Sequence, residues 1–277
     1  MRLSLRGGAV LAAMALFSAG ALPAASAQTV DELLAKHFES RGGLDKLKAL
    51  NTVKMVGTVS GRGSEGTMTA WTKRPNLMRQ EMGAEGQQVI QAFDGVRAWT
   101  VNPMMGMMAP TELPAALADQ IRTASDFDGV LVDYKAKGHT IEIVGPDTVE
   151  GAKVVKLKVT TKAGLSQYVS LDATTGLERK ISAEIEQGDR KMTVETFMSD
   201  YRPVSGIVVP FSVRRYVNGQ LAAEIAFRTI EFNVPIDDSV FRMPGKQPHF
   251  FGKSASVARR PMNPTGSPLV MGGVPTT

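Results

Sequence analysis

The spacing of hydrophobic residues changes at residue 52, and this change constrains the fold more than any other feature of the sequence. Before it, Leu33, Leu34, His37 and Phe38 recur at the spacing of one helix face. After it, apolar and polar residues alternate in short segments, as half-buried β-strands require. The sequence therefore predicts a helix followed by a mainly β body. The early strand segments are 52–59, 67–72, 89–93 and 97–101.

The alternation resumes at residue 139, with a turn signal between most of the segments. Asn218-Gly219 lies between two alternating segments and is the strongest hairpin signal in the chain. Gly145-Pro146-Asp147 and Thr174-Thr175-Gly176 are also typical of turns. The expected later strands are 139–144, 148–160, 165–172, 177–187, 191–201, 207–217 and 220–233.

Helical segments lie before and among the strands. Thr29 and Glu32 form a capping-box pattern at the start of the first helix, and Gly42-Gly43 stops it. Thr111 could cap a second helix from about Glu112 to Thr123 after a break at 103–114. A long antiparallel sheet must also close or cover its edges. We therefore expect a mainly β protein with helices (α+β): a half-open, strongly curved antiparallel β-barrel of about 11 strands, covered by the N-terminal helix and a helical lid.

Residues 1–27 have the pattern of a cleavable signal peptide. Arg2 and Arg6 precede the short apolar run Ala9–Phe17, and Ala25-Ser26-Ala27 forms an A-x-A cleavage site. The chain contains no cysteine, which excludes disulfides, cysteine-ligated metals and a lipid anchor on an N-terminal cysteine. We expect a soluble protein of the periplasm that is not lipid-anchored.

The remaining chain divides at residue 243. Residues 28–243 are the β domain, and 244–277 are rich in Pro, Gly and basic residues, which predicts a disordered tail. The formal net charge is +5, but the basic excess lies in the signal peptide and the tail, neither of which contains an acidic residue. The β domain is thus nearly neutral, and nucleic acid is not an expected partner. The tail is either inert or makes transient contact with an anionic membrane.

No motif in the sequence predicts catalysis. The pattern Gly61-Arg62-Gly63-Ser64-Glu65-Gly66 matches a phosphate-binding loop, but a strand follows it where a helix is needed, so we interpret it as a hairpin loop. The three histidines, His37, His139 and His249, do not cluster at metal-ligand spacing. Carboxylates such as Glu184 and Glu186 are typical of a solvated strand face, which leaves an envelope hydrolase as a minor alternative. We expect no enzyme activity, no cofactor and no metal.

Two features of the segment 71–108 have more than one interpretation. The methionines of Met104-Met105-Gly106-Met107-Met108 could line a site for variable apolar cargo, bind Cu(I), or simply pack. Arg74, just before Pro75, could be a solvated edge residue. Alternatively, its donors could bind backbone carbonyls of a lid helix and break those bonds when cargo enters.

The same segment carries a family resemblance. Lys73-Arg74-Pro75-Asn76-Leu77-Met78 resembles the K-R-P-N-L-F strand of the LolA/LolB superfamily of periplasmic carriers that sort outer-membrane lipoproteins. Asp94-Gly95, Trp99 and Asn102-Pro103 are similar to its D-G-x-x-x-W-x-x-N-P pattern. The resemblance implies an unclosed β-barrel with helical lids over an apolar cavity, no enzyme activity, and a lid held closed by Arg74. Met78 stands where the family motif has an aromatic residue.

From this resemblance and the apolar strands, we expect a soluble periplasmic carrier. It would bind acyl chains of lipoproteins or lipids for transport toward the outer membrane, with membrane-protein donors and acceptors as partners. One alternative is a periplasmic lipid or stress sensor of the RseB type that acts through a protein partner; an envelope hydrolase and a methionine-based copper binder are the others. The expected cavity or lid residues are Trp71, Arg74, Met78, Phe93, Trp99, Met104, Met105, Leu117 and Ile121.

Overall fold

The computed structural model describes residues 28–245, except for 62, 85–86 and 188–189. Residues up to Met243 form one unit and residues from Pro244 a second, of which only 244–245 are described. The predicted signal peptide and nearly all of the predicted tail therefore lie outside the described residues. No helix in the described ranges is long and apolar enough to cross a membrane.

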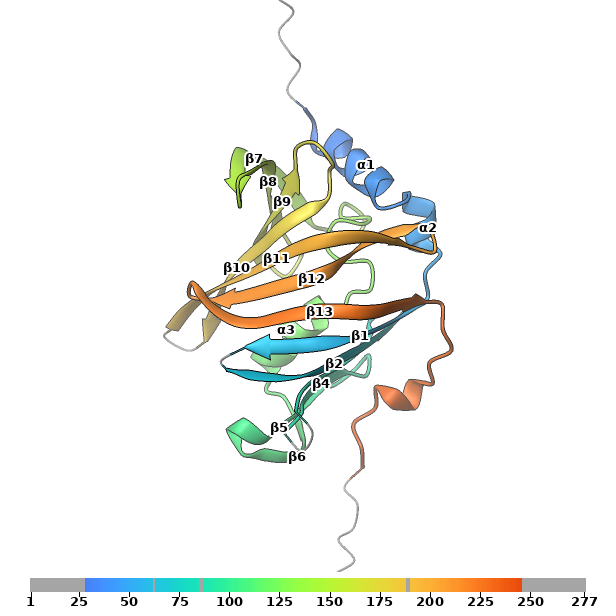
Figure 1. Ribbon diagram of the computed structural model, residues 1–277, viewed down its shortest axis with the longest axis vertical. Helices are drawn as coiled ribbons and strands as arrows, with labels where there is room; N and C mark the ends of the chain where they lie inside the picture. The colour runs from blue at the N-terminus through green and yellow to red at the C-terminus, as the bar shows by residue number, and fades with distance from the viewer. Residues whose placement is uncertain (1–27, 62, 85–86, 188–189, 246–277) are drawn as a thin grey trace, which may run out of the picture. The chain divides into compact units, whose positions relative to one another are not determined.

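The first unit is built on one antiparallel sheet of thirteen strands (Figure 1). β1 and β13 pair with each other in its interior and join two meanders, β1 to β6 and β7 to β13. β6 and β7 lie at the two edges, so the sheet is open. The strands are β1 (Thr52–Gly61), β2 (Ser64–Lys73), β3 (Leu77–Gly83), β4 (Val89–Phe93), β5 (Ala98–Asn102), β6 (Met107–Glu112), β7 (Thr140–Val149), β8 (Ala152–Thr160), β9 (Ser166–Asp172), β10 (Glu178–Gln187), β11 (Arg190–Val204), β12 (Ile207–Val217) and β13 (Gln220–Phe232).

The open antiparallel sheet was predicted, but the number of strands differs from about eleven. β6 occupies part of the segment 103–114, where the sequence predicts a break in the sheet. The predicted turn at Gly145-Pro146-Asp147 is wrong, because β7 runs through it and turns only at Glu150 and Gly151. A proline is tolerated in β7 because this is an edge strand, which has a hydrogen-bonded neighbour on one side only.

Helices and short 3-10 turns complete the unit. The predicted capping box is confirmed, since Glu32 N–H donates to the Thr29 hydroxyl and Thr29 N–H to the Glu32 carboxylate. The predicted cap at Thr111 is wrong, because the helix begins after Pro114 without a side-chain cap. The elements are α1 (Val30–Ser40), α2 (Leu44–Lys48), α3 (Ala115–Ala124), η1 (Pro103–Met105) and η2 (Asp238–Val240).

Strand register divides the side chains between two faces of the sheet. Val53, Thr72, Met78 and Phe93 lie opposite one another on successive strands and therefore share a face. We call this the inner face, because the helices pack on it; Figure 1 shows α3 behind β13 and β1. The opposite face is the outer face. We call the end of the sheet where Gly61 pairs with Ser64 and Val217 with Gln220 the tip end, and the other the base end.

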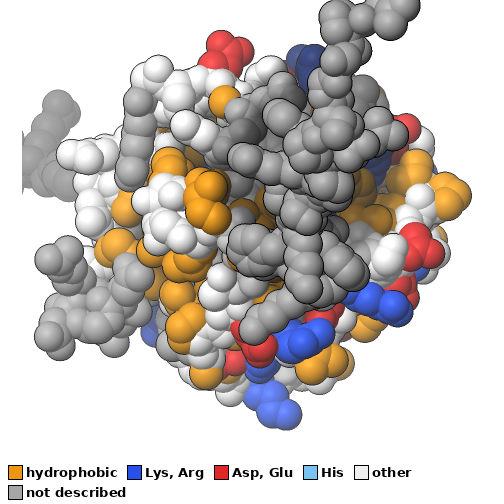
Figure 2. All heavy atoms as spheres, turned by 90° about the horizontal axis from the view of Figure 1, so that it is seen from below, with side chains coloured by type: hydrophobic (Ala, Val, Ile, Leu, Met, Phe, Trp, Pro, Cys, Tyr) orange, Lys and Arg blue, Asp and Glu red, His pale blue; other side chains and the backbone are white. Residues whose placement is uncertain are grey.

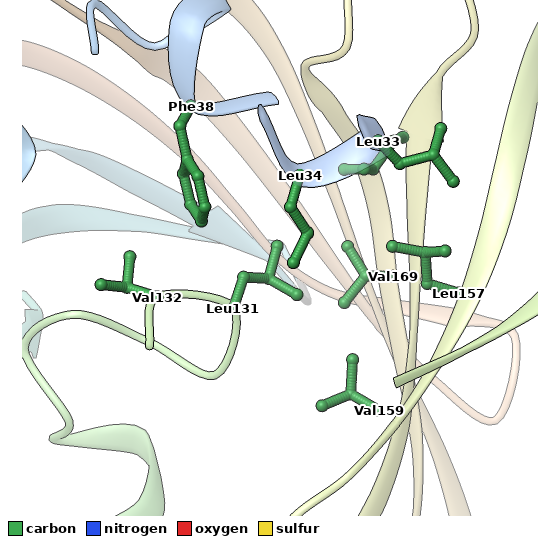
Figure 3. Packing of buried hydrophobic residues seen from close by; sticks show 9 residues of the cluster. Leu33, Leu34, Phe38, Leu131, Val132, Leu157, Val159 and Val169 are labelled. Atoms are coloured by element: carbon green, nitrogen blue, oxygen red, sulfur yellow. The ribbon is translucent and has the colours of Figure 1, made fainter. Parts of the chain in front are cut away.

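α1 buries its apolar stripe against the inner face at one side of the sheet. Leu33, Leu34 and Phe38 point toward the segment after α3 and toward strands β8 and β9 (Figure 3). Full burial of such side chains stabilises the fold by about 1.5–3 kcal/mol each. This cluster fixes α1 and the segment after α3 to the same strands. Its other buried members are Leu131, Val132, Leu157, Val159, Val169 and Leu171.

The chain between α1 and α2 passes very close to the turn between β11 and β12. Gly42 has φ +107, and a Cβ built on it would lie 2.2 Å from the carbonyl oxygen of Gly206. Only glycine has both this backbone freedom and no side chain at the approach. The two glycines therefore position α2 at the base end of the sheet.

Candidate functional site

Arg74 joins three segments that are far apart in the sequence. It follows β2 at the base end, and its backbone N–H donates to Asn51 O at 2.9 Å. Its Nε donates to Leu50 O, and one terminal nitrogen donates to Leu47 O at 3.3 Å. Leu47 belongs to α2, so the guanidinium lies against carbonyls at the C-terminal end of that helix, where a cation is favourable.

The other side of the guanidinium meets the segment that follows α3. Asp128 accepts from both terminal nitrogens of Arg74, with one N–O distance of 2.6 Å. The Phe127 ring lies 4.6 Å from the guanidinium carbon of Arg74, and Phe127 N–H donates to Pro75 O at 3.3 Å. The Arg74 and Asp128 side chains are 25% and 21% exposed, so solvent screens this pair only in part. Arg74 thus holds α2 and the segment after α3 together at the base end of the inner face.

The inner face is buried at the base end and more exposed toward the tip end. Ile207, Val209 and Phe211 of β12 are buried under Leu47 and Leu50. Farther along the same strand Val213 is only half-buried, as are Ile225 of β13 and Val59 of β1, which lie opposite one another. These three apolar side chains lie side by side in the middle of the sheet and form a patch that solvent reaches in part.

Two hollows lie toward the base end. One of about 640 Å³ lies at the base end, lined by residues such as Asn51, Lys73 and Pro235. A second of about 270 Å³ lies beside α2, lined by Lys46, Leu50 and others. We base the site on the apolar tip half of the inner face instead, because polar residues such as Asn51, Lys73 and Asp237 border the first hollow, and the second contains Lys46, Ser205 and Asn233 beside its apolar residues.

Comparison with solved structures identifies this arrangement of strands. A DUF1329 family protein from Desulfovibrio piger matches with a TM-score of 0.51 and 14% identity, over 77% of this chain and 97% of that one. A LolA superfamily protein from Nitrosomonas europaea also matches with a TM-score of 0.51, at 11% identity, over 78% of this chain and 98% of that one. The chain has the LolA superfamily fold. No family model and no curated protein matches its sequence.

Four of the predicted site residues lie where the LolA-like fold brings α3 onto the inner face. Met78 of β3 and Phe93 of β4 are directly opposite each other and buried. Arg122 of α3 lies over the Phe93 ring, with its guanidinium carbon 6.0 Å from the ring centre. Leu117 and Ile121 of α3 are half-buried. Their role in binding or covering cargo stays a prediction.

The two tryptophans require a correction, because register places them on the outer face of this fold. Trp99 lies opposite Ala92, and Trp71 opposite Arg79, whereas Phe93 lies opposite Ala98. Neither tryptophan can therefore line the same wall as Met78 and Phe93. Trp99 is fully buried, and its Nε1 donates to Phe241 O at 2.9 Å.

A segment after β13 covers the outer face at this position, which sequence reasoning missed. Lys73 donates to Ile236 O at 2.9 Å and Arg79 to Val240 O at 2.9 Å. Phe241 is completely buried. Trp99 is therefore a core residue under this segment, and only the apolar character of Phe241 hinted at it.

Met104 and Met105 lie at the surface, and their predicted lining role stays a prediction. Both belong to η1 and are 78% and 66% exposed, and Met108 is 71% exposed. Figure 2 views the molecule from below and shows hydrophobic side chains gathered at the surface on this side. No group of three or more His, Cys, Asp or Glu residues in the described ranges could hold a metal ion.

A buried polar cluster fixes α1 to the β9–β10 turn and was not predicted. His37 Nδ1 lies 3.0 Å from Gly176 O, and its Nε2 lies 4.0 Å from the Glu178 carboxylate. Arg41 also pairs with Glu178, at 3.2 Å. Burial lowers the pKa of His37, against the smaller opposing effect of Glu178. We assign this cluster to stability, because its groups are already satisfied by one another.

Proposed function

We propose that the protein is a periplasmic carrier that binds the acyl chains of lipids or lipoproteins and moves them toward the outer membrane. The half-buried apolar surface at the tip end of the inner face, formed around Val59, Val213 and Ile225, supports this proposal most strongly. The sheet there offers apolar side chains to a ligand that has little need of polar contacts. The fold adds support at the level of architecture alone.

Binding of this kind is partition between two apolar environments. Each acyl CH₂ removed from water gains about 0.8 kcal/mol. A carrier must therefore offer nearly the same apolar surface as the membrane, since a stronger site would never release its cargo. A cover that must be opened at some energetic cost lowers the net affinity into this range.

The segments held by Arg74 would be that cover. α2 and the segment after α3 lie over the base half of the inner face, and Arg74 contacts both through Leu47, Leu50 and Asp128. Entry of an acyl chain toward the base end would separate these segments and break the bonds of Arg74. The proposed chemistry is binding and release, with no catalytic step.

The proposal is tested by transfer of a fluorescent phospholipid from donor to acceptor vesicles. Ile225→Gln places a polar group on the inner face, and Ala226→Gln places the same group on the outer face one residue away. We expect transfer by the wild-type protein and by Ala226→Gln, and roughly tenfold weaker lipid binding by Ile225→Gln. Unfolding midpoints of both variants control for the fold.

The outcomes separate the candidate functions. Binding without transfer would favour the alternative of a lipid sensor acting through a protein partner. Equal loss in both variants would show that the inner face is not the binding surface. If the wild-type protein neither binds nor transfers lipid, the carrier proposal is wrong.

A further inference from the structure

One charged group, Arg215, lies among the described apolar side chains in the tip half of the inner face. Arg215 lies on β12 two residues beyond Val213, opposite Thr196 of β11 and Ala223 of β13. Among the described side chains in the tip halves of β1 and β10 to β13, it is the one charged group that register places on the inner face. The uncharged side chains on this part of the face include Val59, Ile185, Val194, Val213, Val217 and Ile225.

Its neighbour Arg214 shows what a structural arginine on this strand looks like. Arg214 lies on the outer face, binds both carboxylate oxygens of Glu150 at 2.7 and 2.8 Å, and has its guanidinium carbon 5.8 Å from the Phe197 ring centre. For Arg215, by contrast, the described part of the chain provides no hydrogen bond, ion pair or ring contact. A cation with five donors and no counter-charge is available to a ligand.

Arg215 can be reached by a ligand from solvent. The Arg215 side chain is exposed to solvent. Surrounding protein nevertheless removes part of its hydration and lowers its pKa. The guanidinium stays protonated at neutral pH, because an arginine cannot be deprotonated in a protein under such conditions.

We propose that Arg215 binds the carboxylate of a long-chain fatty acid whose hydrocarbon chain lies along Val213 and Ile225 on the inner face. The planar guanidinium matches a planar carboxylate at two points. Arg215 lies opposite the uncharged Thr196 and Ala223, so its neighbours across the sheet supply no counter-charge and a carboxylate can do so. An uncharged ester-linked acyl chain would leave Arg215 unpaired. This inference rests on the proposed carrier function and specifies its ligand.

The test compares two probes on the intact protein: a fluorescent long-chain fatty acid and its methyl ester. The variants are Arg215→Gln, which removes the inner-face charge, and Arg214→Gln, which removes the outer-face charge one residue away. We expect the wild-type protein to bind the acid about tenfold more tightly than the ester, equivalent to about 1.4 kcal/mol. Arg215→Gln should lower the affinity for the acid to that for the ester and leave the ester unchanged. Arg214→Gln should retain the preference for the acid.

Each other result has a definite meaning. Equal binding of acid and ester by the wild-type protein overturns the role of Arg215 while leaving the carrier function intact. A loss of acid preference in Arg214→Gln as large as in Arg215→Gln also overturns it, since the effect would then reflect net charge. Tighter binding of an anionic phospholipid than of the fatty acid overturns the carboxylate assignment. If neither probe binds and vesicle transfer is absent, the carrier function itself fails.

Discussion

Arg74 and Asp128 form a two-point ion pair between positions 54 residues apart in the sequence. The same guanidinium donates to the carbonyls of Leu47 and Leu50. One side chain therefore binds acceptors from two covering segments. Its removal leaves the Asp128 carboxylate and the Leu50 carbonyl without a donor, whereas the Leu47 carbonyl keeps the Leu50 N–H at 3.3 Å. In the carrier model, this energetic coupling sets the cost of opening the cover.

We expect Arg74→Leu to lower the free energy of unfolding by about 1–3 kcal/mol, because it leaves the Asp128 carboxylate and the Leu50 carbonyl without a donor. We also expect a bound acyl probe to be held more tightly and released more slowly, since less energy is spent on opening. Urea unfolding and stopped-flow release from the protein measure the two effects. Arg97→Leu is the control, because Arg97 pairs with Asp94 at 3.5 Å with about half of its side chain exposed. Unchanged affinity and release rates in Arg74→Leu would disprove the cover model.

The pattern of alternation predicted the sheet but could not assign faces where both sides are apolar. In β5, Ala98 and Trp99 are adjacent and both buried, because α3 packs near the inner face and Phe241 covers the outer one. The alternation of residues in β5 carries no information about the segment around Phe241, which lies 142 residues later in the chain and contacts Trp99. The sequence therefore marked Trp99 as important without revealing its side of the sheet.

The charged residues of the site show the same limit. The motif around Arg74 predicted that this residue belongs to the site. The partner of Arg74, Asp128, lies in an irregular segment with no sequence pattern that predicts the contact. Arg214 and Arg215 are adjacent, and only the pairing of β11 with β12 shows which one faces inward. Local spacing predicts elements, whereas register and long-range pairing determine which side chains meet.

His37 predicts a dependence of stability on pH. Burial holds its folded pKa below the ordinary value of 6.5, so the unfolded chain binds a proton more readily than the folded one. The free energy of unfolding should therefore fall as pH decreases from about 7.5 to 5.5, by at most about 1.4 kcal/mol per pH unit for this one group. Urea unfolding at several pH values measures the slope.

The matched variant is His37→Asn, whose amide can still donate to Gly176 O in place of Nδ1. It should flatten the pH dependence. The pKa of His139 is also lowered, mainly by desolvation, so His139→Asn is measured separately to find its share. A slope that His37→Asn does not change would show that other groups control acid stability.

Phe241 predicts that the segment after β13 is part of the folded core. It is completely buried, and Trp99 donates to its carbonyl. Phe241→Ala should lower the free energy of unfolding by about 3–5 kcal/mol and shift tryptophan emission to longer wavelength as water reaches Trp99. Val240→Ala, at a half-buried neighbour, should cost less than half as much. If Phe241→Ala unfolds at the same urea concentration as the wild type, the segment does not cover the outer face in solution.

Alanine substitutions at Gly42 and Gly43 separate two energetic costs: the strain of a positive φ, and the steric clash where the chain before α2 passes the β11–β12 turn. Both glycines have positive φ, +107 and +102, so alanine is strained at either position. A Cβ at Gly42 would meet Gly206 O at 2.2 Å, whereas one at Gly43 would have nothing within 4 Å. Gly43→Ala should therefore cost about 1–2 kcal/mol from conformation alone, and Gly42→Ala should cost more because the backbone must also move. Urea unfolding of the two variants gives the difference directly, and equal costs would mean that α2 does not rest against the turn.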